Sequence, residues 1–133
     1  MAWRYLDLAD FLLIAEAVLQ IAAEDLARAG RLELAESALH APGAEFGGVD
    51  FYPDLARKTA VLASRLIGNH PLPDGNKRVG YLCAIEFVER NGGTWTHPRD
   101  DPAGDETVAI IEGVAAGSVG EDELTAWIAE RLE

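Results

Sequence analysis

The sequence predicts a single all-α domain over residues 1–133, interrupted by one small irregular or β-like flap. Three observations support this prediction. Apolar residues recur at three- and four-residue steps in most segments, which is the period of an amphipathic helix. Glycine and proline gather where these periodic segments stop. A chain of 133 residues suits one hydrophobic core rather than two.

The first half of the chain contains three predicted helices and the flap. Asp7 is expected to cap a helix that begins at residue 8, with Asp10 in its first turn. A short helix over residues 32–39 ends near a proline. Two glycines between aromatic and β-branched residues predict the flap over residues 44–53. Asp54 can cap the next helix, which stops before the prolines at 71 and 73.

The second half is predicted to be helical as well. Asn76 is a good N-cap for a helix that runs to about Arg90, and the segment Val79–Ile85 is apolar on every side. Such a segment is typical of the central helix of a bundle. Residues 94–96 are predicted to be briefly extended, and helices over about 105–116 and 121–132 complete the chain.

Composition limits the function. The chain has 23 acidic and 11 basic residues, and its net charge of −12 argues against binding to nucleic acid or to anionic membranes. Cys83 is the single cysteine and is expected to be a buried small hydrophobe. The N-terminus lacks a signal-peptide pattern, and the longest apolar stretch is too short to span a bilayer. We therefore expect a cytoplasmic location.

One window reverses the acidic character of the chain. Residues 55–85 hold five basic residues and one acid, Asp74. Within this window the segment His70–Arg78 reads HPLPDGNKR, at the predicted junction of two helices. Lys77 and Arg78 fall in the first turn of a helix, where the helix dipole disfavours cations. Because backbone N–H groups and a turn glycine meet at the same point, the segment predicts a binding site for a phosphate.

The other side chains of this segment suit chemistry on a phosphate. Asp74 is the nearest hard oxygen ligand, and one carboxylate together with substrate phosphates is a usual way to hold Mg²⁺. His70 can accept a proton from an attacking hydroxyl. The alternative for His70 is a surface histidine that caps a helix C-terminus, and the offsets of its neighbours favour the catalytic interpretation. The segment is not a Walker A loop, and the three histidines lack the spacing of zinc ligands.

These residues resemble the Fic/Doc family. Its central signature reads His-Pro-Phe-x-Asp/Glu-Gly-Asn-Gly/Lys-Arg, and Leu72 departs from it by replacing phenylalanine. The segment Leu34–Pro42 is similar to the Leu-x-Glu-Ser-Ala-Leu-x-x-Pro stretch of Doc-type members. Family members that transfer AMP carry glycine at the position of Lys77 and a second arginine at the position of Tyr81. The chain therefore looks closest to the Doc-type toxins.

The resemblance implies a Fic/Doc-like helical bundle that binds ATP and Mg²⁺. It implies a toxin of a toxin–antitoxin pair, a protein kinase that transfers the γ-phosphate to a serine or threonine hydroxyl of elongation factor Tu and so inhibits translation. His70 would be the general base and Asp74 the Mg²⁺ ligand, and the flap would align the target beside the loop. The residues expected to hold the phosphates are Gly75, Asn76, Lys77 and Arg78.

Partners and alternatives follow from the same resemblance. We find no inhibitory Ser/Thr-x-x-x-Glu-Gly/Asn motif, so the expected inhibitor is a Phd-like antitoxin whose C-terminal segment folds into a groove. Gly75 is typical of AMP-transferring members, which keeps an AMP transferase open as an alternative. A non-catalytic antitoxin-binding or regulatory domain is a second alternative, and a metal-dependent hydrolase ranks last for want of ligands.

Overall fold

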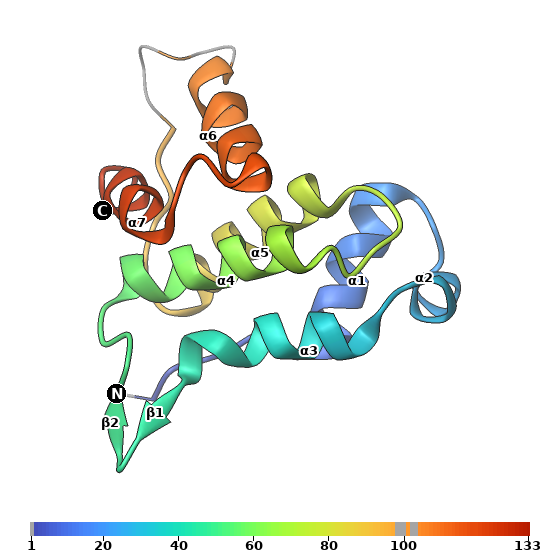
Figure 1. The fold of residues 1–133 in the computed structure, drawn as a ribbon, viewed down its shortest axis with the longest axis horizontal. Coiled ribbons are helices and arrows are strands. Elements are labelled where there is room, and N and C mark those ends of the chain that lie inside the picture. Colours follow the sequence, from blue (N-terminus) through green and yellow to red (C-terminus); the bar gives the residue numbers. More distant parts are fainter. Residues whose placement is uncertain (1, 98–100, 102–103) are drawn as a thin grey trace.

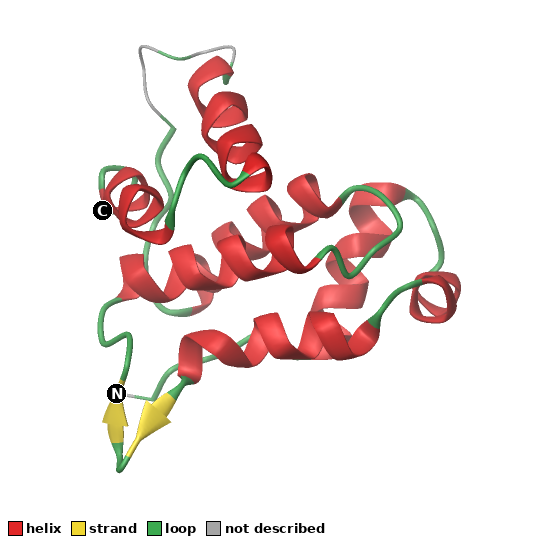
Figure 2. Ribbon diagram, viewed as in Figure 1, coloured by secondary structure: helices red, strands yellow, loops and turns green. Residues whose placement is uncertain are grey.

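The computed structural model describes residues 2–97, 101 and 104–133. Within these residues the fold consists of helices and one short β-hairpin (Figure 2). In chain order the elements are α1 (Leu8–Leu19), α2 (Ala23–Ala29), α3 (Leu32–His40), a 3₁₀ turn η1 (Ala41–Gly43), β1 (Glu45–Phe46), β2 (Val49–Asp50), α4 (Leu55–Asn69), α5 (Asn76–Arg90), α6 (Asp105–Ala116) and α7 (Glu121–Ala129). The predicted all-α class with a small β-like flap is confirmed.

Helix α4, rather than α5, is the central helix. It packs against α3, α5, α6, α7 and η1 (Figure 1). The prediction that the apolar segment 79–85 marks the central helix is wrong, because Leu82 is 39% exposed and Tyr81 and Ile85 are half-buried. α5 leaves this face open because α4, α1 and α6 cover only its other sides. The apolar composition of α5 does not reveal which of its sides the neighbouring helices cover.

Local signals set most helix boundaries. Asp7 and Asp10 form a reciprocal capping box at the start of α1, and the Asp54 carboxylate accepts the backbone N–H of Arg57 at 2.8 Å. Helix α7 ends at Ala129 instead of continuing to Leu132. Leu132 instead forms an antiparallel bridge with Trp95, which is part of the predicted extended segment.

Helix α2 was not predicted. Leu26 is its only buried residue, so its seven residues show no apolar stripe in the sequence. Helix α2 packs against α1, and the backbone N–H of Arg31, just after it, donates to the Pro71 carbonyl in the loop that follows α4. No helix in residues 2–97, 101 and 104–133 combines the length and the apolar character needed to cross a membrane.

The flap is a two-stranded antiparallel hairpin. Glu45 pairs with Asp50 and Phe46 with Val49, and the turn contains two glycines with positive φ. The hairpin precedes the N-terminus of α4, whereas His70 follows its C-terminus (Figure 1). A helix of 15 residues is about 22 Å long. The expectation that the flap lies beside the motif segment is therefore wrong.

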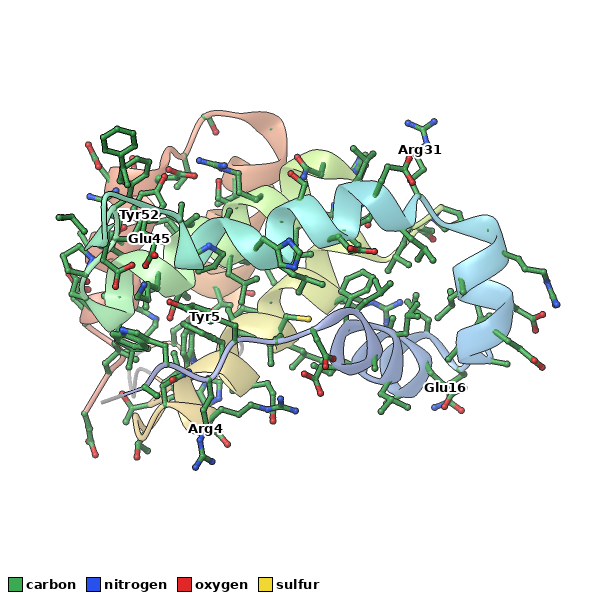
Figure 3. All side chains as sticks on the ribbon, turned by 90° about the horizontal axis from the view of Figure 1, so that it is seen from below. Arg4, Tyr5, Glu16, Arg31, Glu45 and Tyr52 are labelled. Atoms are coloured by element: carbon green, nitrogen blue, oxygen red, sulfur yellow. The ribbon has the colours of Figure 1, made fainter. Side chains whose placement is uncertain are left out.

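A buried lysine anchors this hairpin. Lys58 of α4 is fully buried, and its Nζ donates to the Tyr5 hydroxyl at 2.9 Å, the Pro42 carbonyl at 2.9 Å and Asp50 Oδ1 at 3.1 Å. The ammonium also lies 4.9 Å from the centre of the Trp3 ring. One side chain thus joins the N-terminal segment, η1 and β2 to α4. Figure 3 shows Tyr5, Glu45 and Tyr52 together at this end of the molecule.

Candidate functional site

The motif loop, residues 70–75, connects α4 to α5. His70 ends α4 in the left-handed region with φ of 51°, and Gly75 precedes α5 with φ of 82°. Between them Pro71 and Leu72 are buried, and Leu72 is only 4% exposed within the core. Leucine thus anchors the loop at the position where the family signature has phenylalanine. A histidine in the left-handed backbone region is strained, and residues with strained backbones often occur at functional sites.

Asn76 does not cap α5. It is the first residue of the helix, and Gly75 stands at the cap position. The Asn76 side chain is turned into the loop, where it accepts the Leu72 N–H and donates to the Leu72 carbonyl, both at 2.9 Å. The predicted N-cap is therefore wrong. The Asn76 side chain instead links Leu72 of the motif loop to the start of α5, and the residue is buried, with only 7% of its surface exposed.

The structure brings all six predicted site residues together. They line one cavity of about 210 Å³, called here the motif cavity. Its lining consists of His70, Pro73, Asp74, Gly75, Asn76, Lys77 and Arg78. The first turn of α5 forms one wall, so its free backbone N–H groups favour an anion there.

The charged side chains of the motif cavity differ in their partners. Asp74 Oδ1 accepts the Gly75 N–H at 2.8 Å, and its carboxylate is exposed. Lys77 Nζ forms an ion pair with Glu112 Oε1 of α6 at 2.9 Å. Both partners are more than 40% exposed, so this pair is worth at most about 1 kcal/mol and a phosphate can displace it. Within the described part of the chain, the Arg78 guanidinium has no carboxylate partner.

A second cavity of about 390 Å³, the apolar cavity, lies between α5 and α6. Lys77 and Arg78 border both cavities, so the two lie next to each other. Sequence reasoning missed the other residues of its wall, which include Tyr81, His97, Thr107, Val108, Ile111 and Glu112. The spacing of Thr107 and Ile111 shows that they share a helix face, but the sequence contains no signal that this face meets α5.

The donor set fits a magnesium ion held mainly by substrate. Among residues 2–97, 101 and 104–133, no group of three or more His, Cys, Asp or Glu side chains could hold a metal ion. Asp74 is thus the carboxylate available in the motif cavity. Mg²⁺ keeps several waters and commonly binds through one or two carboxylates plus phosphates, so this arrangement suits it and does not suit zinc.

Cys83 does not belong to the site. It lies on the core-facing side of α5 and is fully buried, as predicted. Burial, with smaller contributions from the nearby carboxylates of Glu86 and Asp10, raises the pKa of the Cys83 thiol to about 12. The thiol is therefore neutral and unreactive at physiological pH.

Comparison with known proteins agrees with the geometry of the loop. The sequence model of the Fic/DOC family matches residues 5–88, which include the motif loop and most of α5. Toxin Doc of Mycolicibacterium smegmatis is 44% identical over 59 residues, a match that spans 44% of this chain and 45% of that relative. The match thus spans less than half of the relative's length. On the extent of the family match, this chain belongs to the Fic/DOC family.

Proposed function

We propose that the chain is a Doc-type toxin of a toxin–antitoxin pair that acts as a protein kinase. Its substrates would be ATP and a serine or threonine hydroxyl of elongation factor Tu, and modification would stop translation. The main support is the convergence of His70, Asp74 and the first turn of α5 on the motif cavity. The likeness to Toxin Doc supports the toxin assignment.

Each residue has a defined task in this proposal. His70 takes the proton of the target hydroxyl as its oxygen bonds to the γ-phosphorus, and the bond from that phosphorus to ADP breaks. Lys77, Arg78 and the N–H groups of α5 hold the phosphate oxygens and balance their charge. Asp74 would hold Mg²⁺, which supplies further neutralisation of the phosphates when it is bound. Asn76 contributes by holding the loop in shape through Leu72.

The apolar cavity gives the nucleotide a second point of attachment. It opens beside Lys77 and Arg78 and is walled by Tyr81, Ile111 and other apolar groups. A flat, largely apolar group such as a nucleobase is suited to such a wall, and polar contacts from Thr107 can orient it. This arrangement would place the base over α6 and the phosphates over α5.

The proposed antitoxin is expected to have a basic segment that folds when it binds. The chain carries a net charge of −12, so a basic disordered segment would be attracted to it. Such a segment would fold as a helix on binding, in the manner expected for a Phd-like antitoxin.

The decisive experiment measures which phosphate reaches the target. Purified full-length chain is incubated with elongation factor Tu and with ATP labelled at either the γ- or the α-position. The kinase proposal expects γ-label on the target and a mass increase of one phosphate. α-Label would establish the AMP transferase instead, and no label with either nucleotide would leave the non-catalytic alternative.

Two histidine variants control this experiment. His70→Ala should lose transfer by at least a factor of about 100, the lower end for removal of a general base. His40→Ala is the matched control, because His40 is an exposed histidine at the C-terminal end of α3 and does not line the motif cavity. Equal activity of the two variants would contradict the role of His70.

A further inference from the structure

A third cavity lies beside the motif cavity and shares His70 with it. It has a volume of about 350 Å³ and is called here the Arg31 cavity. Its lining comprises Ala29, Arg31, His70, Pro71, Leu72 and Pro73. The general base therefore borders two separate hollows, one with the phosphate-binding groups and one without them. Neither the family match nor the predicted motif assigns a role to the second hollow.

The connection between α2 and α3 builds the outer wall of this cavity. The backbone N–H of Arg31 donates to the Pro71 carbonyl at 2.7 Å, which ties this connection to the motif loop. At Gly30, a Cβ atom would meet the Leu26 carbonyl oxygen at 2.8 Å and the Pro71 carbonyl oxygen at 3.0 Å. The close approach requires glycine there. The wall is thus fixed against the loop that carries His70.

The wall also presents a free positive charge. The Arg31 side chain is exposed, and within the described ranges it has no ion pair and no side-chain hydrogen bond. Arg28, three residues earlier in α2, instead pairs with Asp25. In a chain with 23 acidic residues, an arginine without a carboxylate partner beside a cavity is available for an external one. Figure 3 shows Arg31 projecting outward at the start of α3, away from the hairpin.

We propose that the Arg31 cavity is the acceptor subsite, where the target segment with its hydroxyl lies during transfer. This inference rests on the proposed function. In the proposed function the nucleotide takes the motif and apolar cavities, so the hydroxyl must reach His70 from another side, and the Arg31 cavity borders His70 there. Arg31 binds a carboxylate of the target protein near the hydroxyl and so holds the segment in position.

The proposal assigns substrate positioning to this end of the molecule and not to the hairpin. The hairpin lies at the far end of α4, about 22 Å of helix away from His70. Arg31 is therefore a positioning residue for the acceptor, and it does not contact the nucleotide.

The test compares Arg31→Glu and Arg31→Lys with Arg28→Glu in the full chain. Arg28→Glu is matched in type and in net charge change, and Arg28 does not line the cavity. With elongation factor Tu as the probe, Arg31→Glu should raise KM for the target at least tenfold, with kcat and the Kd for ATP unchanged. Arg31→Lys should restore part of the loss, because it keeps the charge but not the bidentate geometry. Arg28→Glu should match the wild type.

The outcomes separate this inference from the function on which it rests. If the wild-type chain binds no ATP or labels no acceptor, the proposed function fails and the acceptor subsite fails with it. If the wild type transfers phosphate but Arg31→Glu keeps the KM of Arg28→Glu, the acceptor subsite alone is overturned. A changed Kd for ATP in Arg31→Glu would also overturn it, because it would place Arg31 on the nucleotide.

Discussion

Replacing Gly75 with alanine would test how tightly the motif loop is held against α1. Gly75 has a φ of 82°, and a Cβ atom added to it would lie 2.4 Å from Cδ2 and 3.2 Å from Cδ1 of Leu19. The substitution therefore has two costs, one in the backbone and one in packing. Gly117 has almost the same φ of 81°, but no atom lies within 4 Å of its Cβ position.

The two glycines separate these costs. Alanine in the left-handed region costs about 1–2 kcal/mol, which is the whole expected effect of Gly117→Ala. At Gly75 the contact with Leu19 adds about 1–3 kcal/mol, as for other overpacked sites. The free energy of unfolding should therefore fall by about 2–5 kcal/mol, towards the lower end of that range because the end of the Leu19 side chain can rotate. In a Leu19→Ala background the contact is absent, and Gly75→Ala should cost only the backbone term.

Urea unfolding followed by circular dichroism measures all four variants, with m-values compared to confirm the same transition. The double-mutant cycle between positions 75 and 19 then isolates the contact. Equal destabilisation by Gly75→Ala and Gly117→Ala, or a coupling near zero in the cycle, would refute the idea that the loop is clamped onto α1.

Four further outcomes are expected. His70→Gly should abolish transfer because it removes the imidazole. It should also raise the free energy of unfolding by about 1 kcal/mol, because glycine adopts the left-handed φ of 51° without strain. A loss of stability in urea unfolding would contradict this. Asn76→Ala should cost about 2–4 kcal/mol by the same assay, since it leaves the buried N–H and C=O of Leu72 unpaired. Lys58→Met should cost about 3 kcal/mol and speed proteolysis of the hairpin, because it removes the three hydrogen bonds that the buried Lys58 Nζ donates; unchanged cleavage would argue against the anchor. The Cys83 thiol should resist a thiol reagent at pH 8 until urea unfolds the chain. Burial raises the pKa of this thiol from 9.0 to about 12, so the unfolded form loses its proton first as the pH rises. The free energy of unfolding should therefore fall between pH 9 and pH 12.

Much of the fold follows from local signals. The Asp7–Asp10 capping box and the Asp54 cap were predicted because a cap needs only a side chain and the backbone three residues away. The limits of α6 were predicted for the same reason, since its apolar period and its flanking glycines are contiguous in the sequence. Helix α2 escaped prediction because Leu26 is its sole buried residue.

The candidate site, too, was predicted only in part from the sequence. The segment from His70 to Arg78 is contiguous, so its composition alone predicted that an imidazole, a carboxylate and two cations would meet at a helix N-terminus, and they line one cavity. The sequence could not predict that Asn76 turns inward to Leu72, because the choice between cap and loop bond depends on the left-handed Gly75.

By itself, the sequence determined the helical class, the main helix boundaries and the membership of the motif cavity, because these depend on neighbours within a few residues along the chain. Only the tertiary structure decided that Glu112 meets Lys77, that Arg31 lies against the motif loop, and that the hairpin lies at the other end of α4. These pairs are brought together by helix packing, which depends on the shapes of many side chains at once, so no short stretch of sequence encodes them.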